Sequence, residues 1–362
     1  MNDKSLIDYA DVGFIALVIS FIVALIIVII FSRFKVSDIS LHATQSSHVT
    51  PTSRLGGIAI VGAILLSSYY HEFYSFNWLW ISSLPILILG VLEDVYFPTS
   101  SKLRLFIGGL SALIGVYLSQ INLTSIDIEP IGILLQFSVI GISFTVFALV
   151  GLINAINFID GTNGLALGFT LICSLALFLV AQKFDEIEIM QLCILLFFAT
   201  LGLFFLNFPV GRIFTGDAGV YSIGFVLGWI IIILAEKNME IAKWSLLSII
   251  IWPVIETLYS IYRRKVNKVA PDKPDFLHLH HVIMRALQIL SRGRISRNKA
   301  NPLAALIILP VVSIPPFLGV LYIEAHRAGI LIVVISAIAY ISIYNFILIA
   351  LKRQRFRKLF LI

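Results

Sequence analysis

The chain has 362 residues, of which 59% are hydrophobic and 13% charged, and its formal net charge is +6 at pH 7. Its mean hydropathy is +1.00, whereas soluble proteins are roughly half apolar and a quarter charged. The composition therefore excludes a soluble protein, and we predict an all-α polytopic membrane protein with one integral-membrane domain over residues 1–362.

Eleven apolar runs are candidates for transmembrane helices, since a helix of about 20 residues crosses the roughly 30 Å hydrocarbon core. In chain order they cover residues 12–32, 55–70, 78–92, 103–121, 131–151, 164–182, 189–206, 218–235, 244–262, 302–323 and 328–351. The shortest must tilt or thin the bilayer. The first is too long for a cleaved signal peptide and lacks its small-residue cleavage pattern, so we expect it to remain a span.

The basic residues predict the orientation, because Lys and Arg are retained in cytoplasmic loops. With the N-terminus outside, 21 of the 26 basic residues are cytoplasmic, and the exceptions are Lys4, Lys183, Lys237, Lys243 and Arg327. We therefore predict a periplasmic N-terminus and a cytoplasmic C-terminus. The positive net charge follows from this asymmetry and does not indicate nucleic-acid binding.

Every prominent polar cluster falls on the predicted cytoplasmic side. The clusters occupy the loops at 33–54, 93–102, 152–163, 207–217 and 263–301, whereas the outer loops are short. We predict that these five loops form one active site that faces the cytoplasm.

Glu93 and Asp94 are adjacent carboxylates at the end of a span, and Lys102 follows eight residues after Asp94. Such a pair repels unless a cation or proton compensates it. With Asp160 and Asp217 it supplies the oxygen ligands that Mg²⁺ prefers, usually one or two carboxylates plus substrate phosphates. We expect Mg²⁺, or Mn²⁺ in its place, with Asp217 and Asp94 as ligands. The alternative is that Glu93 and Asp94 only cap or solvate a helix end.

The segment 154–168 gathers amides, one carboxylate and three glycines between two spans. Its Asp160-Gly161 step permits a close backbone approach to a ligand. Asp217 lies in a similar Thr-Gly-Asp-Ala-Gly segment. We predict a phosphate or metal site here, although the first segment taken alone also fits an ordinary polar turn.

Three histidines, His278, His280 and His281, lie in a basic loop with Arg263. No Cys accompanies them and no spaced His pair follows, which disfavours zinc. Protonated or hydrogen-bonding imidazoles beside cationic groups complement a pyrophosphate or a phospholipid head group. A purely topological role fits the basic tail 352–358, but it does not explain three histidines within four positions.

From about Lys35 to Arg285 these motifs resemble, in order and spacing, the polyprenyl-phosphate N-acetylhexosamine-1-phosphate transferase family. Its members initiate O-antigen, enterobacterial common antigen and teichoic acid synthesis and include the peptidoglycan lipid I translocase. The positions that match its motifs are Asp38, His48, Pro51, Gly56, Gly57, Glu93, Asp94, Lys102, Asn157, Asp160, Gly161, Asn207, Phe214, Asp217, His278, His280 and His281.

The resemblance implies a reaction in the bacterial inner membrane. Undecaprenyl phosphate attacks the β-phosphate of a UDP-N-acetyl-sugar, releasing UMP and leaving undecaprenyl-diphospho-sugar, the initiating step of O-antigen or another cell-envelope polysaccharide. The resemblance implies that Asp217 binds the metal and that Asp94 and Glu93 bind the metal or deprotonate the lipid phosphate. It implies that uridine and ribose are bound by Asn157, Asp160, Gly161, Asn163, Asn207 and Phe214. The diphosphate or sugar would be bound by Lys102, His278, His280 and His281, and Asp38 and His48 would also bind substrate.

Four departures from the family pattern bear on the substrate. Glu93 replaces an aspartate, Asn163 replaces the second aspartate of D-G-x-D-G, Glu256 stands where aspartate is common, and Ser46-Ser47 replaces a basic pair. A carboxylate is kept at 93 and 256, so metal or proton chemistry is retained. The changes at 163 and 46–47 indicate a different nucleotide sugar.

Two alternative functions fit parts of the sequence. The H-x-H-H spacing favours a sugar-phosphate transferase over a lipid I-type enzyme acting on a UDP-muramoyl-peptide. A transporter or flippase would carry ionisable groups near mid-membrane, whereas these spans are almost free of charge. The sequence does not determine the donor sugar or whether a covalent intermediate forms. It does not determine the oligomeric state either, and a homodimer is compatible with it. We favour direct attack, because the lipid phosphate is already an anionic nucleophile once it is held in line.

Overall fold

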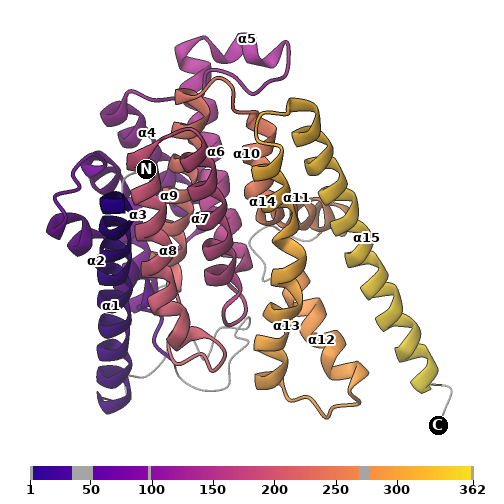
Figure 1. The fold of residues 1–362 in the computed structure, drawn as a ribbon. Coiled ribbons are helices and arrows are strands. Elements are labelled where there is room, and N and C mark those ends of the chain that lie inside the picture. The colour runs from indigo at the N-terminus through magenta and orange to yellow at the C-terminus, as the bar shows by residue number, and fades with distance from the viewer. Residues whose placement is uncertain (1–2, 35–51, 97–98, 269–274, 276, 360–362) are drawn as a thin grey trace.

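The structure is a computed structural model that describes residues 3–34, 52–96, 99–268, 275 and 277–359. Within these residues every regular element is a helix, which confirms the all-α prediction (Figure 1). The helices are α1 (Asp3–Phe34), α2 (Gly56–Tyr70), α3 (Asn77–Val95), α4 (Ser101–Ser119), α5 (Ile131–Leu135), α6 (Ser138–Ile159), α7 (Leu165–Lys183), α8 (Ile187–Asn207), α9 (Gly216–Lys237), α10 (Lys243–Ile249), α11 (Ile251–Val266), α12 (Leu279–Leu290), α13 (Arg297–Val312), α14 (Ile314–Leu321) and α15 (His326–Leu359).

In the described part of the chain, nine segments are long and apolar enough to cross a membrane. The bent pair α10 and α11 is a tenth if it counts as one span, and α2 is apolar but has only 15 residues. Each predicted apolar run thus overlaps a helix. The predicted total of eleven spans is reached only if α2 and the bent pair each count as one span.

Helix α9 is the most deeply buried of the candidate spans. It packs against α2, α3, α6 and α7, while α1 lies against α8 at one edge of the bundle (Figure 1). Nearly all of its side chains are buried, and Trp229 and Phe225 are among the largest fully buried residues. The start of α9 therefore lies among several helix ends, which places Asp217 where other segments can reach it.

The predicted span 131–151 is wrong in its bounds. Residues Ile131–Leu135 form the separate helix α5, and α6 runs on to Ile159. The side-chain amide of Asn154 donates to the carbonyl of Val150 at 2.8 Å, a local bond that lets a polar residue remain inside a helix. The predicted loop 152–163 accordingly shrinks to the residues after Ile159.

The predicted span 244–262 is broken into two helices, because α10 and α11 meet at an angle of 79° near Ile250. Pro253 has no amide hydrogen to donate to the carbonyl of Ile249. The Cys173 thiol donates to that carbonyl instead, at 3.3 Å. Beyond the bend, the predicted loop 263–301 is largely helical, since it contains the end of α11, all of α12 and the start of α13.

Candidate active site

Main-chain hydrogen bonds join the end of the first predicted loop to the segment just before α9. Three main-chain hydrogen bonds hold them, with donor named first: Phe214 to Ser53 (2.8 Å), Gly56 to Phe214 (3.0 Å) and Gly57 to Thr215 (2.7 Å). This pairing brings Arg54 next to Asp217, although 163 positions separate them.

Glycines allow α2 and α3 to approach α9 closely. A Cβ on Gly57 would lie 2.2 Å from the nitrogen of Gly219, and one on Gly90 would lie 2.4 Å from Cα of Ala218. Gly216, immediately before Asp217, has a φ of +72°, which L side chains rarely adopt. These close contacts position the ends of three chain segments around one point.

The acidic pocket, which we define as Arg54, Asp94, Asp160 and Asp217, lies at that point. Arg54 Nε is 3.5 Å from Asp94 Oδ1, and its Nη2 donates to Asp217 Oδ2 at 3.1 Å. Asp160 joins through a long hydrogen bond from the Thr215 hydroxyl, at 3.5 Å. Burial raises the pKa of Asp160 to about 7, with Arg54 opposing this shift and Asp217 adding to it. Three carboxylates thus face one guanidinium, and their negative charge is not fully compensated.

Asp94 anchors the start of α9. Its two oxygens accept the main-chain N–H groups of Asp217 at 2.8 Å and Ala218 at 3.0 Å. Such first-turn amides have no partner within the helix and carry partial positive charge. Asp94 is therefore held in one orientation, with its side chain 0% exposed, against 12% for Asp217.

Glu93 faces a different set of partners from its neighbour Asp94. It is buried and accepts hydrogen bonds from Tyr221 Oη (2.7 Å), Arg104 Nε (2.8 Å) and the N–H of Thr99 (3.1 Å). Lys102 is exposed on the first turn of α4. The structure thus brings Asp94, Asp160 and Asp217 together, but it does not bring Glu93 or Lys102 into the acidic pocket.

The predicted amides mostly tie loops to one another. Four hydrogen bonds do this: Asn163 N–H to Asn301 Oδ1 (2.7 Å), Asn163 Nδ2 to the Pro209 carbonyl (3.0 Å), Gly164 N–H to Asn207 Oδ1 (2.6 Å) and Asn207 Nδ2 to the Ile213 carbonyl (2.8 Å). Asn157 is partly buried near the end of α6, and Phe214 is partly buried in the segment that precedes Asp217. Asn163 and Asn207 therefore shape the site through its backbone.

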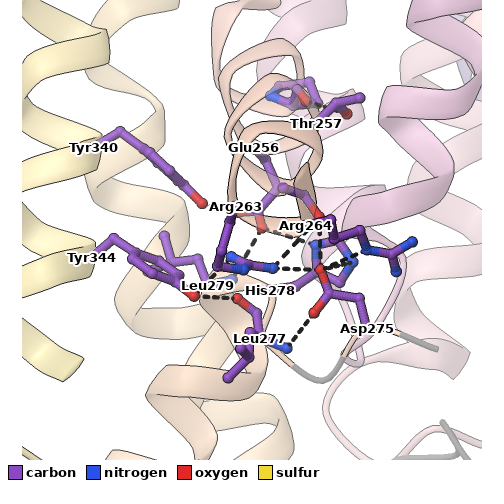
Figure 2. Close-up of polar contacts among 12 residues, drawn as sticks. Glu256, Thr257, Arg263, Arg264, Asp275, Leu277, His278, Leu279, Tyr340 and Tyr344 are labelled. Carbon is purple, nitrogen blue, oxygen red and sulfur yellow. Dashed lines mark hydrogen bonds and ion pairs between the residues drawn. The ribbon is translucent and has the colours of Figure 1, made fainter. Parts of the chain in front are cut away.

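A second polar cluster, which we call the histidine network, centres on Glu256 of α11 (Figure 2). Glu256 is hydrogen-bonded to His278 Nδ1 (3.0 Å), the N–H of Leu279 (3.2 Å) and Tyr340 Oη (2.7 Å). Tyr344, also from α15, accepts from Arg263 (2.8 Å). The network fixes the start of α12 between α11 and α15.

Asp275 closes the histidine network from the loop before α12 (Figure 2). It accepts from the Ser260 hydroxyl (2.7 Å), the N–H of Leu277 (2.9 Å) and the Arg263 guanidinium. Burial alone would raise the pKa of Asp275, but the Ser260 hydroxyl, His278 and these other donors outweigh it and lower the pKa to about 2. In contrast to Asp160, this carboxylate is fully compensated.

His280 packs directly on the Asp160-Gly161 turn. A Cβ on Gly161 would lie 1.9 Å from His280 Nε2, and the His278 ring stacks on Phe158 with centroids 5.5 Å apart. Burial lowers the pKa of His280 well below its ordinary value and, with His278 adding to the shift, lowers that of His281 to about 4. Of the protonated and hydrogen-bonding forms predicted for these rings, the structure therefore supports the neutral one for His280 and His281.

The acidic pocket suits a hard divalent cation. Its donors are carboxylate oxygens, and when ionised the three carboxylates beside one guanidinium leave negative charge for a cation to neutralise. Among the described residues no group of three or more His, Cys, Asp or Glu side chains is arranged to hold a metal by itself. An ion here would bind through one or two carboxylates and the phosphates of a substrate.

Comparison with known proteins agrees with this arrangement. Residues 76–235 match the model of the family described as glycosyl transferase family 4. A probable undecaprenyl-phosphate N-acetylglucosaminyl 1-phosphate transferase of Bacillus subtilis (strain 168) is 28% identical over 285 residues, which are 76% of this chain and 79% of the relative. The chain is thus similar to glycosyl transferase family 4 over residues 76–235.

Two further relatives are named undecaprenyl-phosphate alpha-N-acetylglucosaminyl 1-phosphate transferase. That of Thermotoga maritima is 27% identical over 67% of this chain and 72% of its own length. That of Escherichia coli (strain K12) is 28% identical over 64% of this chain and 65% of its own length. The glycosyl transferase family 4 match runs from α3 to α9 and so includes Asp94, Asp160 and Asp217, while Arg54 and the histidine network lie outside it.

Sequence reasoning missed several residues that hold the candidate site together. They are Arg54, Arg104, Tyr221, Asn301 and Tyr340. Arg54 lies two positions before the Gly56-Gly57 pair and Arg104 two positions after Lys102, and both were usable signals. Tyr340 lies in an apolar run and gave none. Asp38, His48 and Pro51, predicted from the first loop, lie outside the described residues.

Proposed function

We propose that the protein transfers an N-acetylhexosamine-1-phosphate from a UDP-sugar to undecaprenyl phosphate, releasing UMP and leaving undecaprenyl-diphospho-sugar. The observation that carries this proposal is the acidic pocket, where carboxylates from α3, α9 and the loop after α6 surround Arg54. The match of residues 76–235 to the model of glycosyl transferase family 4 and the names of the relatives support it. Those names make UDP-N-acetylglucosamine the first donor to test, ahead of the N-acetylgalactosamine, N-acetylfucosamine and N-acetylquinovosamine donors.

The reaction we propose is one displacement at phosphorus. An oxygen of the lipid phosphate bonds to the β-phosphorus as the bond from that phosphorus to the oxygen bridging to the α-phosphate breaks, and UMP leaves with that oxygen. Phosphoryl transfer depends on positioning and on neutralising charge. Direct attack needs no protein nucleophile, which is consistent with Asp94 being held by two amides of α9.

We propose Mg²⁺ as the cofactor, with Mn²⁺ as a substitute, held chiefly by Asp217 with Asp94 and Asp160 beside it. The ion would neutralise charge on the diphosphate. Asp217 is the better candidate of the two predicted ligands because its side chain is partly exposed while that of Asp94 is fully buried.

The remaining roles stay proposals. Asn157 and Phe214 would contact uridine and ribose, and Asn163 and Asn207 would act through the loops they tie together. Lys102, which is exposed, would contact the diphosphate. Glu93, held by Tyr221, Arg104 and Thr99, would position α3 against α4 and α9 and would not deprotonate the lipid phosphate.

We also propose that the acidic pocket faces the cytoplasm from the bacterial inner membrane. Figure 1 shows the start of α9 at the end of the bundle where α15 ends, and the connection from α9 to α10 at the other end. Because both native cysteines are buried, Arg292→Cys and Met239→Cys proteins can be labelled in sealed vesicles. The proposed topology requires cytoplasmic labelling of the first and periplasmic labelling of the second. We also propose a homodimer, which a measurement of the native mass of the protein in detergent would test.

The decisive experiment is turnover by purified protein. The protein is incubated with undecaprenyl phosphate, Mg²⁺ and a panel of UDP-N-acetyl-sugars that includes UDP-muramoyl-peptide, and UMP and lipid-linked product are measured. UMP release that requires both the lipid phosphate and Mg²⁺ supports the proposal and identifies the donor. No release from any donor by folded protein would contradict it and favour a transport function.

A further inference from the structure

Arg54 lies at the outer side of the acidic pocket. Its side chain is 35% exposed, compared with 12% for Asp217 and 0% for Asp94. The exposure therefore decreases from the guanidinium to the carboxylates behind it. An anionic ligand that enters from the aqueous side meets Arg54 before it meets Asp94.

The guanidinium bridges two helices through their carboxylates. Its Nε is 3.5 Å from Asp94 of α3, and its Nη2 is 3.1 Å from Asp217 of α9. Burial would lower the pKa of Arg54, but Asp217, Asp94 and Asp160 outweigh it and raise the pKa. Arg54 is thus a permanent cation beside the same carboxylates that we propose for a divalent ion.

Two cations at one set of carboxylates repel each other and compete for oxygen lone pairs. A guanidinium has five N–H donors in a planar fork that matches the oxygens of a phosphate. If a divalent ion takes over part of the carboxylate charge, Arg54 can exchange a carboxylate partner for a phosphate oxygen. This exchange is electrostatically favourable for both the divalent ion and Arg54, because the diphosphate brings negative charge to the two cations.

The main chain around Arg54 permits this exchange without a loop movement. The carbonyl of Ser53 accepts from Phe214 at 2.8 Å, and the N–H of Gly56 donates to Phe214 at 3.0 Å. The backbone is therefore fixed on both sides of Arg54. Only rotation of a long side chain is needed to move the guanidinium.

We propose that Arg54 is a tethered cation that shares Asp94 and Asp217 with the divalent ion and binds the diphosphate of the nucleotide sugar once that ion is present. This inference rests on the proposed function and adds a specific residue to it. It makes two predictions of opposite sign: loss of the Arg54 charge tightens metal binding and weakens nucleotide-sugar binding.

The first test measures Mn²⁺ binding to detergent-purified protein by electron paramagnetic resonance, with no nucleotide or lipid added. Arg54→Gln should bind Mn²⁺ about threefold or more tightly than the unsubstituted protein, because a repelling charge is gone. Arg54→Lys, which keeps the charge, should bind within about twofold. Arg327→Gln removes an exposed arginine from the first turn of α15 and should leave Mn²⁺ affinity unchanged.

The second test measures the KM for the UDP-sugar at saturating Mg²⁺. Arg54→Gln should raise it roughly tenfold, because a charge-assisted hydrogen bond to phosphate is lost, and Arg54→Lys should raise it less. Unchanged or weaker Mn²⁺ binding by a folded Arg54→Gln protein would overturn the proposal. Should thermal melts show that Arg54→Gln does not fold, an unchanged KM in Arg54→Lys would overturn it instead.

The two tests also separate this inference from the proposed function. Mn²⁺ binding needs no turnover, so tighter binding by Arg54→Gln would support the shared carboxylates even if no UDP-sugar is used. Turnover by the unsubstituted protein with Mn²⁺ binding that Arg54→Gln leaves unchanged would support the transferase and reject the role of Arg54.

Discussion

The acidic pocket and the histidine network both contain buried carboxylates and arginine, but they differ in how far the carboxylate charge is compensated. In the network, Glu256 and Asp275 each receive three or more hydrogen bonds from side chains and main chain. In the pocket, three carboxylates share one guanidinium. Accordingly, the pKa of Asp275 is lowered to about 2 while that of Asp160 is raised to about 7. A compensated cluster stabilises the fold, whereas uncompensated charge in a conformationally fixed pocket is suited to a ligand of opposite charge.

The largest effect that would test this comparison is on turnover. Asp217→Asn should lower UMP release by at least about a hundredfold, because a charge that faces the metal and diphosphate is removed. Its melting temperature should stay the same or rise, since repulsion within the pocket decreases. Near-normal activity of the folded variant would contradict the metal assignment.

Removing the central carboxylate of the histidine network should act on stability instead. Glu256→Ala leaves His278, Tyr340 and the N–H of Leu279 without their acceptor and should cost roughly 3–5 kcal/mol of unfolding free energy. Glu256→Gln keeps one acceptor oxygen and should cost less. If Glu256→Ala melted like the unsubstituted protein, the network would not be the scaffold described here.

The close packing of α2 on α9 offers a matched pair of glycines. Gly57→Ala places a Cβ 2.2 Å from the nitrogen of Gly219, while Gly62→Ala, on the same helix, meets nothing within 4 Å. We expect Gly57→Ala to cost roughly 1–3 kcal/mol and to lower activity by displacing Arg54. Gly62→Ala should be neutral or stabilise by about 0.5–1 kcal/mol. Equal melting temperatures for the two variants would show that α2 can move away from α9 without loss.

The raised pKa of Asp160 predicts a pH dependence of stability. Between its ordinary value of 3.8 and about 7, the folded protein retains a proton on this carboxyl that the unfolded chain releases. Stability from this group should therefore decrease as pH rises across that window, and added Mg²⁺ should oppose the decrease. Melting curves of metal-free protein from pH 4 to 8 measure it, and Asp160→Asn should flatten the slope. An unaltered slope in that variant would assign the dependence to other groups.

The smallest effect concerns α15. Tyr340→Phe removes one donor to Glu256 and should cost about 1 kcal/mol. The KM for the nucleotide sugar should not change, since Tyr340 lies in the compensated region. A changed KM with unchanged stability would mean that the histidine network contacts substrate.

The broad architecture could be predicted because apolar length determines membrane helices. Glu93 and Asp94 show where prediction stopped. Neighbours on a helix point about 100° apart, so Asp94 reaches the start of α9 while Glu93 reaches Arg104 and Tyr221. Adjacency in the sequence suggested one shared metal site, and the rotation of α3 about its axis, which periodicity alone did not fix, decides otherwise.

The bend near Ile250 illustrates the same limit. Pro253 was visible in the sequence, but a proline in an apolar run fits a kinked span as well as two separate helices. At the 79° bend the carbonyl of Ile249 accepts a hydrogen bond from the thiol of Cys173, which lies in α7, about 80 residues earlier in the chain. Asp94, Asp160 and Asp217 were all predicted, whereas Tyr340 and Asn301 depend on distant packing of this kind.

The contact between Gly161 and His280 limits how this protein can be re-engineered. The imidazole fills the space that any larger residue at 161 would need, so each of the two motifs has its shape defined by the other. A change that replaces His280 with a side chain of another shape would leave the unchanged 160–164 turn without its packing partner. Donor-swapping designs should therefore exchange residues 160–164 and 278–281 as one cassette.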